Sequence, residues 1–514
     1  MSEYIAAIDQ GTTGTRCLIF DLRGQAVASA YREHRQIFPQ PGWVEHDPLE
    51  IWARTQEVVG EALRLAPRGR VLGVGVTNQR ETTVAWDVRS GRPVYNAIVW
   101  QDTRTEPDCR ALIEAGWQDD VRERTGLPIT MYFSATKFRW LLANIPEVRD
   151  LARNGHLRLG TVDAWVIWNL TGGPSGGAHV TDPTNASRTL LCNLKDLAWD
   201  PVLIERFGVP EGALPEIRPS AAQAPYGHTL RDGAFGVSIP VCGDLGDQQA
   251  ALVGQACFAP GEAKNTYGTG SFLLQHVGGT PARSARGLLG TAGYVLSEGR
   301  SAGAGAIAES PGRAYALEGS IAITGAAVQW LRDNLGLISS AAETEAIAQQ
   351  VPDAGGIYFV PAFSGLFAPY WDMSARGAIL GLTRFVTKAH LVRATLEAIC
   401  FQSREVLDAM VADSGKPVPV LKVDGGATGN DFLMQLQADI LGVPVVRPVV
   451  RETTSLGAAY AAGLGLGVFG STMELRRLWR ADRTFEPRWD HARRESALAG
   501  WRRAVERTRG WIES

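Results

Sequence analysis

The sequence is poor in cysteine, with 6 in 514 residues, at positions 17, 109, 192, 242, 257 and 400. Their irregular spacing, without any CxxC pair, argues against a disulfide framework and against a zinc site. The chain also lacks an apolar run long enough to span a bilayer, and its start lacks the basic segment and apolar core of a secretion signal. These absences predict reduced thiols, a cytoplasmic location and no membrane insertion.

Neither sign of charge is in large excess. Lys and Arg total 51 and Asp and Glu total 54, which leaves a net charge of −3. Such a chain has no general attraction for nucleic acid or for an anionic membrane, so neither is expected as a partner. The 45% of hydrophobic residues and 20% of charged residues are ordinary for a globular enzyme. A length of 514 residues predicts two or more domains.

Two stretches have the pattern of a β-hairpin whose turn is rich in glycine and threonine. The first joins apolar runs 4–9 and 16–22 through "QGTTGT", and the second is "EAKNTYGTGSFLLQHV", residues 262–277. Two similar hairpins suggest a duplicated α/β unit. We expect an N-terminal lobe of residues 1–257 and a C-terminal lobe of residues 258–514.

Other segments fit the same α/β organisation. Residues 48–66 have helical periodicity, and residues 421–446 predict a strand, a glycine turn, an amphipathic helix and a second strand. Residues 297–313 are rich in small residues and predict an exposed loop. The tail from about Glu486 predicts a helix that closes over the second lobe.

Both hairpin turns have the chemistry of a phosphate-binding loop. In "DQGTTGTR", Gly11 and Gly14 free the backbone to curl, so that N–H groups and threonine hydroxyls can surround a phosphate. Asp9, at the strand end, is suited to hold Mg²⁺ through water. Gly and Thr are equally common in an ordinary hairpin turn, so one such turn leaves both interpretations open. A turn in each half, however, can hold the two ends of a triphosphate.

A third glycine turn and an aspartate extend this pattern. "DGGATGND", 424–431, permits close approach of a nucleoside or an α-phosphate, and a plain strand-to-helix turn is the alternative. Asp247 in "GDQQAALVGQ" precedes an apolar helical stretch, where aspartate is a favoured N-cap residue. Its functional interpretation is a general base that takes a proton from an attacking alcohol. Asp244 lies three residues earlier, but Asp247 is the better candidate for the base because it stands at the start of the helical stretch.

A charged pair also lies between two apolar segments. "VLGVGV" and "TTVAW" predict buried strands, and Arg80 and Glu81 stand between them. A guanidinium donates to hydroxyl groups while a carboxylate accepts from them, so the pair suits recognition of a polyol. A structural ion pair is the alternative interpretation.

Several of these stretches together resemble the FGGY carbohydrate kinase family, most closely its members that phosphorylate glycerol. The resemblance runs in order from residue 9 to about 460 and is carried by "DQGTTGTR", "PGWVEHDP", "TNQRET", "YNAIVWQ", "YFSATKFRWLL", "DPTNASRTL", "GDQQAA", "AKNTYGTG", "YALEG", "VQWLRD", "PAFSGLFAPYWD", "ARGAILGLTR" and "DGGATGNDFLMQ". It implies an α/β fold of two ribonuclease-H-like lobes, of the sugar kinase, Hsp70 and actin type, with ATP in an interlobe cleft.

The resemblance also implies a role for each matching residue. Glycerol would be bound by Arg80, Glu81, Tyr132, Asp247 and Gln248, with Trp100 and Phe272 forming an apolar wall. ATP would be bound by Thr12, Thr13, Gly14, Arg16, Thr269, Gly325, Gln329, Gly426 and Asn430. Asp9 would serve Mg²⁺, and Asp247 would be the catalytic base.

The activity implied is ATP-dependent phosphorylation of glycerol to sn-glycerol 3-phosphate in glycerol catabolism. Glycerol and ATP are then the small-molecule partners, and we expect a homo-oligomer, either a dimer or a tetramer. A kinase of the same family for another small polyol or a pentulose is the nearest alternative. A non-catalytic nucleotide switch of the Hsp70 or actin kind is a further alternative, although such a switch needs no polyol pocket.

Three departures from the family pattern are informative. Gly14 stands where many relatives have serine, which removes one hydroxyl that could contact phosphate. The stretch 297–313 is longer than its counterparts. The stretch "GHTLRDGAFGVSIP" lacks the glycine-rich, basic run with which some bacterial members bind fructose 1,6-bisphosphate, so that inhibition is not expected here.

Overall fold

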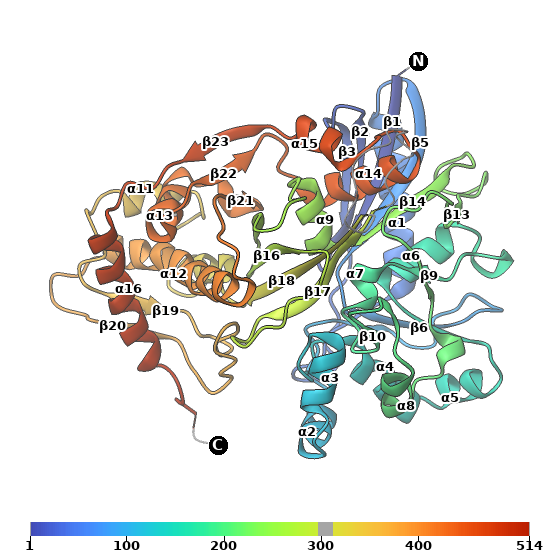
Figure 1. Ribbon diagram of the computed structural model, residues 1–514, viewed down its shortest axis with the longest axis horizontal. Helices are drawn as coiled ribbons and strands as arrows, with labels where there is room; N and C mark the ends of the chain where they lie inside the picture. The colour runs from blue at the N-terminus through green and yellow to red at the C-terminus, as the bar shows by residue number, and fades with distance from the viewer. Residues whose placement is uncertain (1, 297–311, 513–514) are drawn as a thin grey trace.

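The computed structural model describes residues 2–296 and 312–512, and each half of the molecule contains a large β-sheet (Figure 1). The first sheet has the order β13-β14-β5-β1-β2-β3. Strands β1, β2 and β3 are antiparallel, whereas β5 and β14 continue the sheet in parallel. The bounds are β1 (Ser2–Gln10), β2 (Gly14–Asp21), β3 (Ala26–Glu33), β5 (Gly69–Asn78), β13 (Gly227–His228) and β14 (Pro240–Gly246).

The second sheet repeats this arrangement. Its order is β17-β18-β16-β15-β21-β22-β23, with β15 antiparallel to β16 and parallel to β21. Its central strands β18-β16-β15-β21-β22 therefore follow the same order and directions as β3-β2-β1-β5-β14. The predicted duplication of an α/β unit is confirmed. The bounds are β15 (Ala263–Tyr267), β16 (Ser271–Gly278), β17 (Leu289–Val295), β18 (Arg313–Ile321), β21 (Leu421–Asp424), β22 (Val445–Pro448) and β23 (Ala481–Phe485).

The other elements connect and cover the sheets. The α-helices are α1 (Pro48–Leu65), α2 (Glu106–Glu114), α3 (Gln118–Thr125), α4 (Ser134–Asn144), α5 (Pro146–Arg153), α6 (Val162–Leu170), α7 (Pro183–Ala186), α8 (Pro201–Phe207), α9 (Asp247–Gly254), α10 (Gly325–Asp333), α11 (Glu343–Ala348), α12 (Lys388–Ser414), α13 (Asp431–Leu441), α14 (Thr453–Gly465), α15 (Thr472–Leu478) and α16 (His491–Glu506). The short 3-10 helices are η1 (Gly173–Ser175), η2 (Glu211–Ala213) and η3 (Gly426–Gly429). The small strands are β4 (Glu45–His46), β6 (Thr83–Asp87), β7 (Ala97–Ile98), β8 (Leu157–Thr161), β9 (Val180–Thr181), β10 (Cys192–Asn193), β11 (Ala198–Trp199), β12 (Glu216–Ile217), β19 (Tyr358–Val360) and β20 (Ala378–Leu380).

The first sheet is covered on both faces. Successive side chains of a strand point to opposite sides, so neighbouring residues of β1 show what covers each face. Ile8 of β1 belongs to a buried cluster with Val58 of α1. Its neighbour Ala7 belongs to a different cluster, with Leu456 of α14. Strand β1 is therefore apolar at consecutive positions, as a strand buried on both faces must be. Helix α14 belongs to the C-terminal part of the chain, yet it covers the first sheet.

Helices α9 and α14 pack with their backbones in direct contact. A Cβ atom added to Gly254 of α9 would lie 1.9 Å from the carbonyl oxygen of Thr453. A Cβ atom added to Gly457 of α14 would lie 1.8 Å from the carbonyl oxygen of Ala250. Glycine is required at both positions because any side chain would push the two helices apart. This contact fixes α9 against α14 along the part of the helix that contains Ala250 and Gly254.

A Gly457→Ala substitution is therefore expected to lower the free energy of unfolding by about 1–3 kcal/mol, the usual cost of overpacking a core. Urea denaturation measures the change. The matched control is Gly60→Ala in α1, where no atom lies within 4 Å of an added Cβ. There the lower backbone freedom of alanine is expected to raise stability by about 0.5–1 kcal/mol. Equal stability of the Gly457→Ala variant and the parent protein would contradict the close helix contact.

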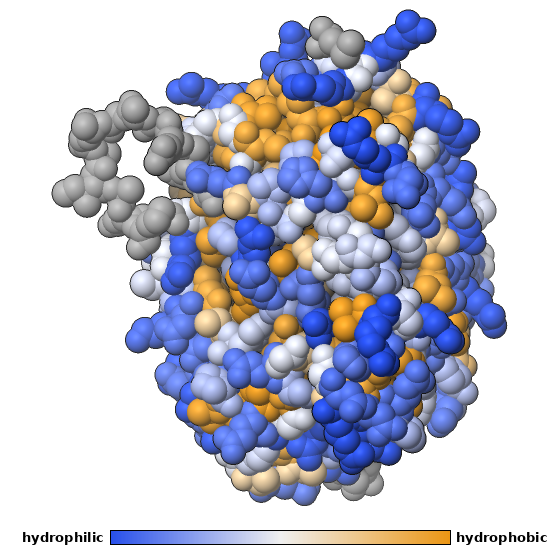
Figure 2. All heavy atoms as spheres, turned by 90° about the vertical axis from the view of Figure 1, so that its right-hand side faces the viewer, coloured by the Kyte–Doolittle hydropathy of each residue, from blue (hydrophilic) through white to orange (hydrophobic). Residues whose placement is uncertain are grey.

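The face of the molecule that Figure 2 shows is mostly polar. Figure 2 shows hydrophilic residues over most of this side of the molecule, with hydrophobic residues visible between them and gathered near the top. In residues 2–296 and 312–512, no helix is long and apolar enough to cross a membrane.

Most segment predictions are confirmed. Both hairpins form, as β1 with β2 and β15 with β16, and the helix expected from residue 48 is α1. Residues 421–446 form β21, η3, α13 and β22, and the tail helix α16 packs into the second-half core through Trp501. The loop expected at 297–313 falls, for residues 297–311, outside the described residues, and Arg313 already begins β18. The lobe boundary at 257/258 stays a prediction.

Candidate active site

The charged pair of the sequence lies at the end of a central strand. Strand β5 ends at Asn78 and β6 begins at Thr83, and Arg80 and Glu81 occupy the turn between them. Glu81 has a φ of 61°, in the left-handed region that residues other than glycine rarely adopt. Such a conformation persists only where the surrounding structure holds it, and functional sites are where it is most often found.

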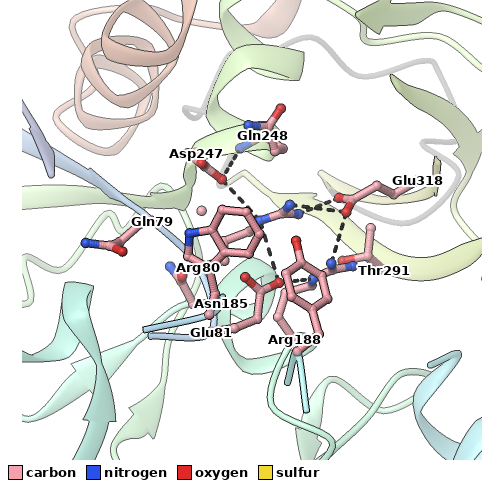
Figure 3. A network of polar contacts seen from close by, with 12 residues as sticks. Gln79, Arg80, Glu81, Asn185, Arg188, Asp247, Gln248, Thr291 and Glu318 are labelled. Atoms are coloured by element: carbon pink, nitrogen blue, oxygen red, sulfur yellow. Dashed lines mark hydrogen bonds and ion pairs between the residues drawn. The ribbon is translucent and has the colours of Figure 1, made fainter. Parts of the chain in front are cut away.

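Arg80 and Glu81 are joined by two further buried charges, Arg188 and Glu318 (Figure 3). These four residues form what we call the charge cluster. Both terminal nitrogens of Arg80 donate to the carboxylate of Glu318 on β18. Arg188, which follows α7, donates from Nε to Glu81 over 2.6 Å and from Nη2 to Glu318 over 2.9 Å. The cluster thus links the turn after β5 to a strand of the second sheet.

The direct pairing of Arg80 with Glu81 is loose. Arg80 Nε lies 3.9 Å from Glu81 Oε1, whereas it lies 3.1 Å from Asp247 Oδ1. The alternative interpretation of the sequence, an ion pair between Arg80 and Glu81, is therefore only a minor contact. Each of the two residues pairs mainly with another residue. Burial by itself would raise the pKa of Glu318, but Arg188 and Arg80 outweigh it and lower that pKa to about 2. Glu81 is affected differently, since burial raises its pKa despite the two arginines.

Asp247 stands between the charge cluster and solvent. It is the first residue of α9, and the N-cap position belongs to Gly246, so Asp247 is not the cap that the sequence left as an alternative. Its side chain is 31% exposed, which leaves the carboxylate open to a ligand. Asp244, the other acid of this segment, is fully buried. Burial, followed by the neighbouring Asp163 and Asp182, raises the pKa of Asp244 well above its ordinary value, which favours its neutral form.

Gln248 of α9 is oriented by a buried lysine of the second sheet. Lys264 of β15 donates to Gln248 Oε1 over 2.5 Å, and also to Thr266 Oγ1 and the carbonyl oxygen of Phe272. Because an ammonium group only donates hydrogen bonds, this contact fixes the amide with its oxygen toward Lys264. Burial lowers the pKa of Lys264 to about 8, although Asp424 and Asp247 oppose the shift.

The predicted apolar wall lies beside these polar groups. The ring of Trp100 is 5.5 Å from that of Tyr132 and 6.5 Å from that of Phe272, measured between centroids. The guanidinium of Arg80 lies 5.9 Å from the Phe272 ring. Phe272 comes from β16 and the other two rings come from the first half, so both halves contribute to this wall.

The first glycine turn is tied to that wall. Trp100 Nε1 donates to Thr12 Oγ1 over 2.9 Å, and Thr13 Oγ1 lies 3.4 Å from the phenol oxygen of Tyr31. Arg16 forms an ion pair with Glu452, which is half exposed. A Cβ atom added to Gly14 would lie 2.5 Å from the carbonyl oxygen of Arg32, so a side chain there would require the neighbouring strand β3 to shift.

Asp9 is a partly buried carboxylate without enough positive charge around it. Ser455 of α14 donates to its Oδ2 over 3.0 Å. Burial raises the pKa of Asp9 to about 6, because it outweighs Arg16 and Ser455, which favour the carboxylate, and Asp247 adds to the increase. A divalent cation would supply the missing charge, so this residue fits the proposed metal role. In the described residues, no group of three or more His, Cys, Asp or Glu side chains could hold a metal by itself.

In the second half, the backbone brings the predicted nucleotide residues close together. Thr269 accepts through its carbonyl oxygen from Thr324 and Ala326, next to Gly325 at the start of α10, the helix that also bears Gln329. A Cβ added to Gly325 would lie 2.6 Å from the carbonyl oxygen of Gly268, so the two segments touch.

The third glycine turn lies against the same hairpin. A Cβ on Gly425 would lie 2.2 Å from the Tyr267 carbonyl oxygen, whereas Gly426 faces open space. The side chain of Asn430 caps α13 and donates to Thr344 over 3.1 Å. The structure therefore brings Thr269, Gly325 and the turn at Gly425 together at one hairpin, whereas Asn430 contacts Thr344.

Three residues near the predicted site were missed by the sequence analysis: Arg188, Glu318 and Lys264. All three are fully buried, and each is a single charge within a mostly apolar or small-residue stretch. A lone charge in a short stretch of apolar and small residues, as in "YALEGS", was the available signal, because burying an unpaired charge is costly. Arg80, Glu81 and Asp247, by contrast, were predicted, and they converge on one set of contacts.

Comparison with known proteins covers nearly the whole chain. The N-terminal domain of the FGGY family of carbohydrate kinases matches residues 4–254, and the C-terminal domain matches residues 263–466. A glycerol kinase of Mycobacterium tuberculosis (strain ATCC 25618 / H37Rv) is 58% identical over 515 residues, covering 100% of this chain and 97% of that protein. A glycerol kinase of Saccharopolyspora erythraea is 56% identical over 515 residues, with 100% of both chains covered. The structure of Plasmodium falciparum glycerol kinase with ADP has a TM-score of 0.90 and 37% identity, and the match covers 100% of this chain and 99% of that one.

Proposed function

Because the chain belongs to the FGGY family of carbohydrate kinases, we propose that it transfers the γ-phosphoryl group of ATP to a terminal hydroxyl of glycerol. The products are sn-glycerol 3-phosphate and ADP. The observation that carries the proposal is the convergence of Arg80, Glu81 and the accessible Asp247 beside an aromatic wall. Relatives named glycerol kinase that match this chain over its whole length, at 58% and 56% identity, support the choice of substrate.

Glycerol carries a hydroxyl on each carbon, so its recognition requires both donors and acceptors at short range. Arg80 Nε is buried and has no hydrogen-bond partner, although Asp247 Oδ1 lies 3.1 Å away. A hydroxyl placed there would accept from Arg80 and donate to Asp247. Glu81 would accept from a second hydroxyl, and Gln248 would donate through the amide nitrogen that Lys264 leaves free.

Asp247 has the role of general base in this proposal. It takes the hydroxyl proton as the new oxygen–phosphorus bond forms and as the bond to the β-phosphate oxygen breaks. Residues of both halves hold ATP in this proposal. The first half binds phosphates through Thr12, Thr13, Gly14 and Arg16. The second half binds the nucleotide through Thr269, Gly325, Gln329, Gly426 and Asn430. Asp9 would hold Mg²⁺, and the ion, when bound, would supply positive charge that neutralises phosphate charge. Excluding water and aligning the reactants supply most of the acceleration.

A substrate panel tests the assignment. ADP release, measured by a coupled assay across glycerol, erythritol and pentuloses, is expected to give the highest kcat/KM with glycerol. A higher kcat/KM for a larger polyol or a pentulose would replace glycerol by that substrate within the same family. ATP hydrolysis that no polyol stimulates would instead favour a nucleotide switch.

We further propose a cytoplasmic location, which the six buried and unpaired cysteines support. The homo-oligomeric state, dimer or tetramer, stays a prediction. Sedimentation of the purified protein measures it directly.

A further inference from the structure

We propose that the phenol hydroxyl of Tyr31 is a phosphate-binding group of the nucleotide site, supplied by the strand next to the glycine turn. The inference rests on the proposed function, because it requires ATP phosphates at the turn of residues 9–16. Tyr31 belongs to β3, outside every segment to which the sequence assigned a role.

The first observation is the position of Tyr31 beside the side chains of the turn. Tyr31 of β3 is directly paired with Arg16 of β2, so both side chains lie on the same face of the sheet. The Arg16 guanidinium carbon lies 5.5 Å from the centroid of the Tyr31 ring. The phenol oxygen lies 3.4 Å from Thr13 Oγ1. One side chain therefore touches two of the residues proposed to hold phosphate.

The second observation concerns Gly14. A Cβ atom built on Gly14 would lie 2.7 Å from the phenol oxygen of Tyr31 and 2.7 Å from its ring carbon Cε2. Together with the carbonyl oxygen of Arg32, which would lie 2.5 Å away, the phenol fills the space that a side chain at position 14 would need. Position 14 contributes no hydroxyl to the turn, and Tyr31, on the neighbouring strand, places one 2.7 Å from where a Cβ at position 14 would lie.

The chemistry of a phenol suits this position. Its O–H donates, and an anionic phosphate oxygen accepts, which gives a charge-assisted hydrogen bond stronger than one between neutral groups. Tyr31 is 38% exposed, so its hydroxyl remains within reach of a ligand. The ring, resting on Arg16, holds the hydroxyl at the turn with few rotatable bonds.

A purely structural Tyr31, packing on Arg16 and needing no hydroxyl, gives a different expectation. Tyr31→Phe distinguishes the two, because it keeps the ring and removes only one oxygen. We expect KM for ATP to rise about tenfold, as for the loss of one hydrogen bond to a charged group, with KM for glycerol unchanged. The matched control is Ser29→Ala, which deletes a hydroxyl two residues away on the same strand and face. Both KM values are expected to stay at the parent level there.

Steady-state kinetics at saturating glycerol, with circular dichroism to confirm folding, measure these values. An unchanged KM for ATP in the Tyr31→Phe variant would overturn the inference, as would a change confined to glycerol. Either result would leave the parent enzyme phosphorylating glycerol and the proposed function intact. Failure of the proposed function would appear differently, as a parent protein that releases no ADP with glycerol.

Discussion

The Asp247→Asn variant is expected to turn over about 10²-fold or more slowly than the parent enzyme while still binding glycerol in part. Asparagine keeps the size of the side chain and its contact with Arg80, but it cannot accept the proton of the attacking hydroxyl. The loss should therefore appear in kcat and much less in KM for glycerol. Steady-state kinetics by coupled ADP assay give both constants, and glycerol binding is measured by calorimetry.

The control is Asp244→Asn, three residues away on β14. Since burial raises the pKa of the Asp244 carboxyl and so favours its neutral form, we expect an amide there to change the charge little. This variant should keep near-parental kcat. Near-normal turnover of Asp247→Asn would show that Asp247 is not the base. A large loss of kcat in Asp244→Asn would make Asp244 the candidate instead.

Glu318→Gln is expected to have the second large effect, on stability and on glycerol affinity together. Glu318 is the buried carboxylate that both Arg80 and Arg188 donate to, and removing one partner of a buried ion pair costs about 3–5 kcal/mol. Arg80 also loses the contact that fixes its orientation toward Asp247. We expect a lower free energy of unfolding in urea and a KM for glycerol raised about tenfold or more, because a misplaced donor weakens substrate binding.

Glu397→Gln is the matched control for this change. Glu397 is also buried and receives a bond of 2.9 Å from Arg393, but it lies on α12, away from the charge cluster. It should lose stability and keep the parental KM for glycerol. A Glu318→Gln variant with an unchanged KM would contradict the positioning of Arg80 by Glu318.

The stability difference between the parent and Glu318→Gln is also expected to depend on pH. In the folded protein Arg188 and Arg80 lower the pKa of Glu318 from 4.5 to about 2. Its ionised form therefore stabilises the fold fully above 4.5, and this contribution disappears as the pH falls toward 2. Urea denaturation at neutral pH and below 4.5 should show the difference becoming smaller in acid.

Features encoded by a few neighbouring residues could be predicted from the sequence, whereas contacts between residues far apart in the chain could not. The two hairpins, the turn containing Gly425 and the strand–turn placement of Arg80 follow from patterns a few residues long. The partner of Arg80 could not be read in this way, because Glu318 lies 238 positions further along the chain. Adjacent opposite charges suggested that Arg80 pairs with Glu81, but the left-handed turn at Glu81 directs the two groups to different partners.

The covering of the first sheet by α14 has a consequence for synthesis of the protein on the ribosome. Ala7 of β1 is buried against Leu456, so one face of an N-terminal sheet stays open until almost the entire chain has been translated. Nascent chains usually fold domain by domain from the N-terminus, but here the earliest strands must wait for a late helix. Until then the apolar strands of this sheet are exposed in the nascent chain, and we expect chaperones to bind there.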